Sequence, residues 1–184
     1  MNKFEAVGMR KKIEDPGALV INTCSDNDTK ERGSLTRWSW SNPTNRMYPH
    51  VYYSYTAVST ECLWQGTKIP RTNPRNEPDP LTLAGDWRRG KGKRPRGAYA
   101  GPDAAPITTP GGARRAIYIP AFCSQIERWM AEDETVAEWV QTARDHDGTV
   151  YLRDHDTGRG VDRNGPMSHA WLLSVYLNTG RWPA

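Results

Sequence analysis

The sequence contains no apolar run that approaches the roughly 18 residues of a membrane helix, and no apolar signal core stands near its start. It has only three cysteines, Cys24, Cys62 and Cys123, and no C-x-x-C pair. Neither a zinc knuckle nor a redox pair is therefore indicated. These absences predict a cytoplasmic protein with free thiols and no membrane partner.

The net charge is also small, at +4. This mild basic bias does not by itself establish nucleic-acid binding, because an anionic small molecule such as a nucleotide fits it equally well. The chain nevertheless holds eight Trp and eight Tyr, and disordered chains are poor in aromatic residues. Its 184 residues fit one folded domain, 1–184, which can bury a core without staples.

Apolar spacing and capping residues predict an α+β domain with several helices around a few short strands. Strands are expected at 18–23, 51–55, 116–119 and 149–152. Helices are expected at 60–69, from 120 onward, at 133–144 and at 168–180. We expect a partly disordered tail at 1–17 and a long loop at 70–112, where Pro and Gly are frequent and aliphatic residues are few.

The most informative stretch is T-E-C-L-W-Q-G-T-K, residues 60–68. At 100° per residue, one helix face would present an acid, an indole, an amide and a base together: Glu61, Trp64, Gln65 and Lys68. The opposite face is small or apolar, and Gly66 permits a close neighbour. A solvated surface helix is the simpler interpretation. Against it, Trp64 would expose a large ring, and Glu61 in the first turn gains from the helix dipole.

The pattern T-E-x-x-W-Q-x-x-K resembles the glutamate motif of the NADAR (NAD- and ADP-ribose-associated) family. That family includes the N-glycosidase of riboflavin-biosynthesis intermediates and enzymes that remove ADP-ribose from guanine. Residues 41–43 (S-N-P), 48–50 (Y-P-H) and 158–165 resemble its opening segment and glycine-rich loop. The family's His after the glutamate is Cys62 here, and its Trp-Gly near the last helix has no counterpart. Residues 166–176 also resemble an uncharacterised bacterial and phage family.

The resemblance implies an N-glycosidase acting on an ADP-ribose-type or nucleotide-derived substrate, such as ADP-ribose on a nucleobase, with Glu61 as the catalytic carboxylate. Such a bond breaks through an oxocarbenium-like state, which a nearby carboxylate stabilises without a metal or other cofactor. The expected substrate-binding residues are Trp38, Asn42, Trp64, Gln65, Lys68, Arg88, Arg89, Asn164 and His169. Of these, the amides would position substrate or water, the cations would contact phosphate, and a Trp would stack on the ring.

The basic segment 86–96, D-W-R-R-G-K-G-K-R-P-R, leaves other functions open. It could contact phosphate, with Trp87 and Tyr99 as stacking rings, in a non-catalytic nucleic-acid-binding protein. It could equally be a solvated basic loop, and it lacks the order of a Walker loop. A third possibility is a phage or host enzyme of modified-nucleotide or DNA-modification metabolism that transfers a glycosyl or ADP-ribosyl group. Transfer and hydrolysis need the same oxocarbenium stabilisation, and a modified nucleic acid remains a possible partner.

Two D-H-D triplets occupy residues 145–147 and 154–156. Carboxylates beside imidazoles can hold a metal. The strand expected at 149–152 would place the triplets at its opposite ends, so we expect turn and capping roles for most of these side chains and no metal site.

Overall fold

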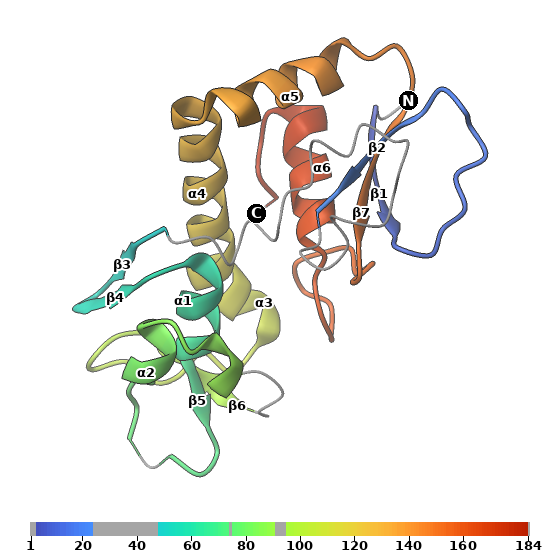
Figure 1. Ribbon diagram of the computed structural model, residues 1–184. Coiled ribbons are helices and arrows are strands. Elements are labelled where there is room, and N and C mark those ends of the chain that lie inside the picture. Colours follow the sequence, from blue (N-terminus) through green and yellow to red (C-terminus); the bar gives the residue numbers. More distant parts are fainter. Residues whose placement is uncertain (1–2, 24–47, 74, 91–94, 184) are drawn as a thin grey trace. The chain divides into compact units, whose positions relative to one another are not determined.

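The computed structural model describes residues 3–23, 48–73, 75–90 and 95–183 (Figure 1). Contacts divide the chain into two compact units, which we call the terminal unit (residues 1–43 and 126–184) and the central unit (residues 44–125). The α+β class predicted from the sequence is confirmed. The single domain over 1–184 stays a prediction. No helix in the ranges described here is long and apolar enough to span a membrane.

The terminal unit contains a three-stranded sheet in which β7 (Val150–Asp154) lies between β1 (Phe4–Gly8) and β2 (Leu19–Asn22). Both outer strands run parallel to β7, so the carboxyl ends of all three strands meet at one edge. Val150 and Leu152 of the middle strand are fully buried. The strands predicted at 18–23 and 149–152 are therefore confirmed as β2 and β7, with small shifts at their ends.

The strand β1 corrects the prediction of a partly disordered tail at residues 1–17. Phe4, Ala6 and Val7 are buried, and the strand pairs with β7 from Phe4↔Val150 to Gly8↔Asp154. A five-residue strand whose partner lies far along the chain leaves little periodicity in the sequence. Its stability comes from the ladder and from burial against the sheet, which only the folded chain supplies.

Helices of the terminal unit begin and end where the sequence predicted. The carboxylate of Asp133 accepts a backbone N–H in the first turn of α5 (Glu134–Asp145), and the hydroxyl of Ser168 does so in α6 (His169–Thr179). Gly180, at φ 68°, ends α6 in the left-handed conformation that glycine adopts easily. The α6 helix packs on β1 and β7, and Asn178 exchanges two hydrogen bonds with the backbone of Phe4.

The central unit is built from short elements. Its described strands form the hairpin of β3 (His50–Tyr52) with β4 (Tyr55–Ala57) and the antiparallel pair of β5 (Lys68–Pro70) with β6 (Pro95–Ala98). Its described helices are α1 (Thr60–Gly66), α2 (Pro80–Leu83), the 3-10 turn η3 (Trp87–Arg89) and the helical run that begins at α3 (Pro110–Ala113). Leu63 and Cys62 of α1 join Leu83 and Ile117 in its apolar core. The prediction of a long loop at 70–112 was wrong where α2, η3, β6 and the start of α3 lie. Elements of three or four residues are too short to show a periodic pattern in the sequence.

The strand predicted at 116–119 is also wrong. Helical backbone continues from α3 through the π-helical η4 (Arg114–Tyr118) into α4 (Ile119–Glu132), within which the division between the units falls. The run A-I-Y-I resembles a buried strand. Ala113, Ile117 and Ala121, however, are spaced by four residues and are all buried, which is the pattern of one helix face.

Candidate functional site

The helix α1 begins at Thr60, as the sequence predicted, and of the two candidate caps, Ser59 and Thr60, it is Ser59 that caps it. The Ser59 hydroxyl accepts the backbone N–H of Cys62 at 3.2 Å, and Glu61 stands in the first turn. A carboxylate in that position is favoured by the partial positive charge of the helix N-terminus. Gly66 permits the close neighbour that we expected, because a Cβ atom there would lie 2.5 Å from a methyl group of Leu83.

Three side chains of this region form one hydrogen-bonded chain. Gln65 Nε2 donates to Glu61 Oε1 at 2.7 Å, and Lys68 Nζ donates to Gln65 Oε1 at 2.6 Å. Gln65 is buried, whereas Glu61 and Lys68 are half-buried. The amide therefore holds the acid on one side and the base on the other.

Lys68 does not lie on the helix, which corrects the prediction of a helix over 60–69. The helix ends at Gly66, Thr67 caps it, and Lys68 opens β5 opposite Ala98 of β6. Its long side chain still reaches back to Gln65. The ladder with β6, which follows almost thirty residues later, ends the helix early, and this partner could not be seen in the local pattern.

Trp64 supplies an aromatic wall beside the same chain of groups. The Lys68 ammonium lies 5.0 Å from the centre of the Trp64 ring, and the ring meets Tyr118 edge-on at 5.4 Å. Tyr118 in turn stacks on Phe122. A cation held over an indole is attracted by the ring's negative face. The sequence could not predict Tyr118 here, because it was assigned to a strand.

Burial lowers the pKa of Lys68 to about 8 from its ordinary value of 10.5, and the negative charge of Glu61 opposes that shift. The ammonium is thus still charged at neutral pH but loses its proton a little above it. The charged ammonium can bind an anion at neutral pH, and a pKa this close to neutral also suits a group that passes a proton.

A buried polar network joins Thr60, in the first turn of α1, to His50 and Gln125. The Thr60 hydroxyl donates to Gln125 Oε1, so it accepts from His50 Nε2 at 2.8 Å. Thr60 and Gln125 are fully buried, and burial is the main cause that lowers the pKa of His50 below its ordinary value. The imidazole is therefore neutral at pH 7. Sequence reasoning missed Gln125, which gave no signal beyond a polar residue in an apolar helix.

Replacing Thr60 by valine is expected to lower the free energy of unfolding by about 2 kcal/mol, because buried His50 and Gln125 each lose a partner while the shape is kept. Thr60→Ser keeps the hydroxyl and is expected to lose clearly less. Urea unfolding of the two variants measures the difference. Equal losses would mean that the methyl group, and not the network, matters at this position.

The expected phosphate ligands Arg88 and Arg89 lie on η3 of the central unit. Arg89 Nε pairs with Asp79 Oδ2 at 3.4 Å, and the Arg88 guanidinium lies 5.2 Å from the centre of the Trp87 ring. Gly90, at the end of η3, lies directly against α1, since a Cβ atom there would come within 2.7 Å of the Gln65 carbonyl oxygen. Both arginines are exposed, and their contact with phosphate stays a prediction.

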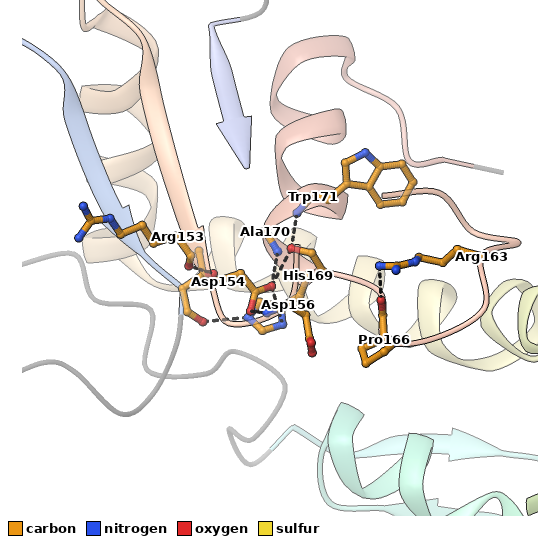
Figure 2. A network of polar contacts seen from close by, with 10 residues as sticks. Arg153, Asp154, Asp156, Arg163, Pro166, His169, Ala170 and Trp171 are labelled. Atoms are coloured by element: carbon orange, nitrogen blue, oxygen red, sulfur yellow. Dashed lines mark hydrogen bonds and ion pairs between the residues drawn. The ribbon is translucent and has the colours of Figure 1, made fainter. Parts of the chain in front are cut away.

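A second polar cluster lies in the terminal unit, where β7 ends (Figure 2). Buried Asp154 accepts the Ser168 hydroxyl at 2.7 Å and the Ala170 N–H at 3.3 Å, both at the start of α6. His169 has Nδ1 3.5 Å from Asp154 Oδ2 and Nε2 3.0 Å from the carbonyl oxygen of Thr23. Asp154 thus has the capping role predicted for it, and His169 is held by protein oxygens at both ring nitrogens.

The other predicted site residues are not brought to α1 by anything described. Asn164 is exposed in the loop before α6, and Asn164 and His169 belong to the terminal unit, whereas Glu61 belongs to the central unit. Their joint action stays a prediction. Trp38 and Asn42 lie outside the described residues. Within the described ranges no group of three or more His, Cys, Asp or Glu side chains could hold a metal ion.

Most of the chain matches a known protein family. A family model described as "Family of unknown function (DUF6939)" matches residues 10–173. No curated protein and no solved structure matches the chain.

Proposed function

The chain belongs to this family of unknown function, and from its own side chains we propose that it is an N-glycosidase whose catalytic carboxylate lies in the central unit. It hydrolyses the N-glycosidic bond of an ADP-ribose-type or other nucleotide-derived substrate. The observation that carries the proposal is the hydrogen-bonded chain from Glu61 through Gln65 to Lys68, with Trp64 beside it. The acid can stabilise the reacting sugar, and an amide, a cation and an indole can bind the rest of a nucleotide.

Glu61 acts as the catalytic carboxylate. As the bond to the base lengthens, positive charge develops on the ribose, and a carboxylate next to the anomeric carbon stabilises that charge. The same carboxylate accepts a proton from the attacking water. Gln65 keeps Glu61 oriented through its 2.7 Å hydrogen bond, so no side-chain rearrangement is needed when the charge appears.

Lys68 and Trp64 bind the rest of the substrate. The ammonium is held by Gln65 and lies over the indole, so its position is defined before an anion arrives. A phosphate of the substrate bonds to the ammonium, and the base or ribose lies on the exposed part of the Trp64 ring. The similarity of T-E-x-x-W-Q-x-x-K to the NADAR motif supports the same roles, although Cys62 replaces the motif's His. A nucleotide substrate and the buried thiol of Cys62 fit a cytoplasmic protein.

Identification of the products tests the proposal. The purified protein is incubated in oxygen-18 water with NAD, ADP-ribose, free nucleotides and ADP-ribosylated guanine in DNA, and products are measured by mass spectrometry. Hydrolysis is expected to release a free base and a ribosyl product with one labelled oxygen at the anomeric carbon. A ribosyl product joined to an added acceptor without the label would mean transfer. Absence of a released base from every substrate would contradict the proposal.

The pH dependence of the Michaelis constant should follow Lys68. Because its pKa is about 8, only about a tenth of the ammonium remains charged at pH 9, whereas most is charged at pH 7. We expect KM for a phosphate-bearing substrate to rise about tenfold between pH 7 and pH 9, with kcat changing less. Lys68→Arg keeps its charge over this range and should flatten the profile. A wild-type KM that does not change with pH would remove Lys68 from phosphate binding.

A further inference from the structure

Charge is distributed unevenly between the two units. The central unit holds 12 Lys and Arg against 5 Asp and Glu, a formal charge of +7, whereas the terminal unit holds 13 against 16, a formal charge of −3. The modest net charge of the whole chain hides this asymmetry. A unit of 82 residues with such an excess is expected to attract polyanions.

Three arginines gather at one end of the β5–β6 ladder, and we call them the arginine cluster: Arg71, Arg75 and Arg96. Pro70 pairs with Pro95, so Arg71 and Arg96 flank the same end of the ladder. Arg96 Nη2 donates to the backbone carbonyl of Arg75 at 3.4 Å, which brings the third residue alongside. All three are exposed. The sequence pattern points to the basic segment 86–96 and gives no signal for Arg71 or Arg75.

Within the part of the chain that the structure describes, the arginine cluster forms no ion pair with a carboxylate. The side chains of Arg71 and Arg75 form no hydrogen bond or ion pair with the described residues. The carboxylate of Asp79, the capping residue of α2, accepts the Leu81 N–H and pairs with Arg89. Grouped like charges repel one another, so a bound anion would relieve an unfavourable interaction. Guanidinium groups match phosphate oxygens with two parallel hydrogen bonds.

We propose that the arginine cluster binds the phosphodiester backbone of a single-stranded nucleic acid. One nucleotide presents few negative charges and would leave most of the excess of +7 uncompensated, whereas a strand presents one at every residue. Arg96 lies in β6, and Arg71 and Arg75 lie between β5 and α2. The half-exposed Trp87 ring, with the Arg88 guanidinium over it, gives the same unit a surface on which a base can stack.

Fluorescence anisotropy with a labelled single-stranded oligonucleotide of about 16 bases tests this binding. The triple variant Arg71→Gln, Arg75→Gln, Arg96→Gln is compared with a control that removes the same charge from exposed positions of the terminal unit: Arg128→Gln, Arg144→Gln, Arg181→Gln. The cluster variant should bind at least tenfold more weakly and the control within about twofold of wild type. The slope of log affinity against log salt should fall by about 2 in the cluster variant only.

Other outcomes would overturn the proposal. If both triple variants lost affinity for the oligonucleotide equally, binding would depend on the net charge of the protein and not on the arginine cluster. Displacement by polyglutamate as effective as displacement by the oligonucleotide would point to an acidic polypeptide. Displacement by ADP-ribose at equimolar amounts would point to a nucleotide site. Binding does not depend on the glycosidase chemistry, so Glu61→Gln should bind the oligonucleotide like wild type. Circular dichroism and thermal melting confirm that each variant is folded.

Discussion

Glu61→Gln is expected to lower the rate of base release about a thousandfold while leaving the fold intact. The amide has the shape of the carboxylate, and its oxygen can still accept the hydrogen bond from Gln65 Nε2. It lacks the negative charge that stabilises the oxocarbenium-like state, and loss of one such electrostatic contact typically costs a factor of about 10²–10³. The rate is measured on the substrate found by mass spectrometry, and stability by urea unfolding.

The matched control is Glu134→Gln. Glu134 also lies in the first turn of a helix, but it is exposed and belongs to the terminal unit. We expect its rate to stay within about twofold of wild type, because surface substitutions away from a site are usually nearly neutral. If Glu61→Gln kept the wild-type rate, the carboxylate would not take part in catalysis, and another group would have to stabilise the developing charge.

Gly158→Ala is expected to lower the free energy of unfolding by about 3 kcal/mol. A Cβ atom at this buried position would overlap both the Arg163 guanidinium and the backbone carbonyl oxygen of Pro166. The same loop is held together because Arg163 donates to Pro166, and Ser168 N–H donates to the Gly158 carbonyl at 3.0 Å. The added methyl group therefore displaces backbone that positions the cap of α6.

Gly17→Ala provides the comparison. A Cβ atom there would come no closer than 3.4 Å to the Asp15 carboxylate, which is ordinary contact, and the backbone is not in the left-handed region. Its effect on stability should stay within about 0.5 kcal/mol. If urea midpoints of the two alanine variants were equal, residues 158–168 would not be packed as described.

The sequence predicted the starts of α1, α5 and α6 and the end of α6. Ser59, Asp133 and Ser168 cap α1, α5 and α6, and Gly180 ends α6. A cap is a hydrogen bond between residues two or three positions apart, so its cause lies within the same few letters of sequence. Glu61 and Gln65 share one helix face for a similarly local reason, because residues four positions apart are neighbours on a helix.

Pairing between strands far apart in the chain decided the features that the sequence did not predict. The strand β1 exists because β7 lies beside it, and Lys68 leaves the helix because β6 pairs with β5. Neither pairing leaves a periodic pattern, since each strand is five residues or shorter.

The chemical groups of the candidate site were readable from the sequence, and their environment was not. The sequence by itself determined that an acid, an indole, an amide and a base follow one another along residues 61–68. Only the tertiary structure decided that burial lowers the pKa of Lys68 to about 8, and that His50 and Gln125 hold Thr60 from two other elements. Burial and distant hydrogen bonds depend on which segments pack together, and packing is a property of the whole folded unit.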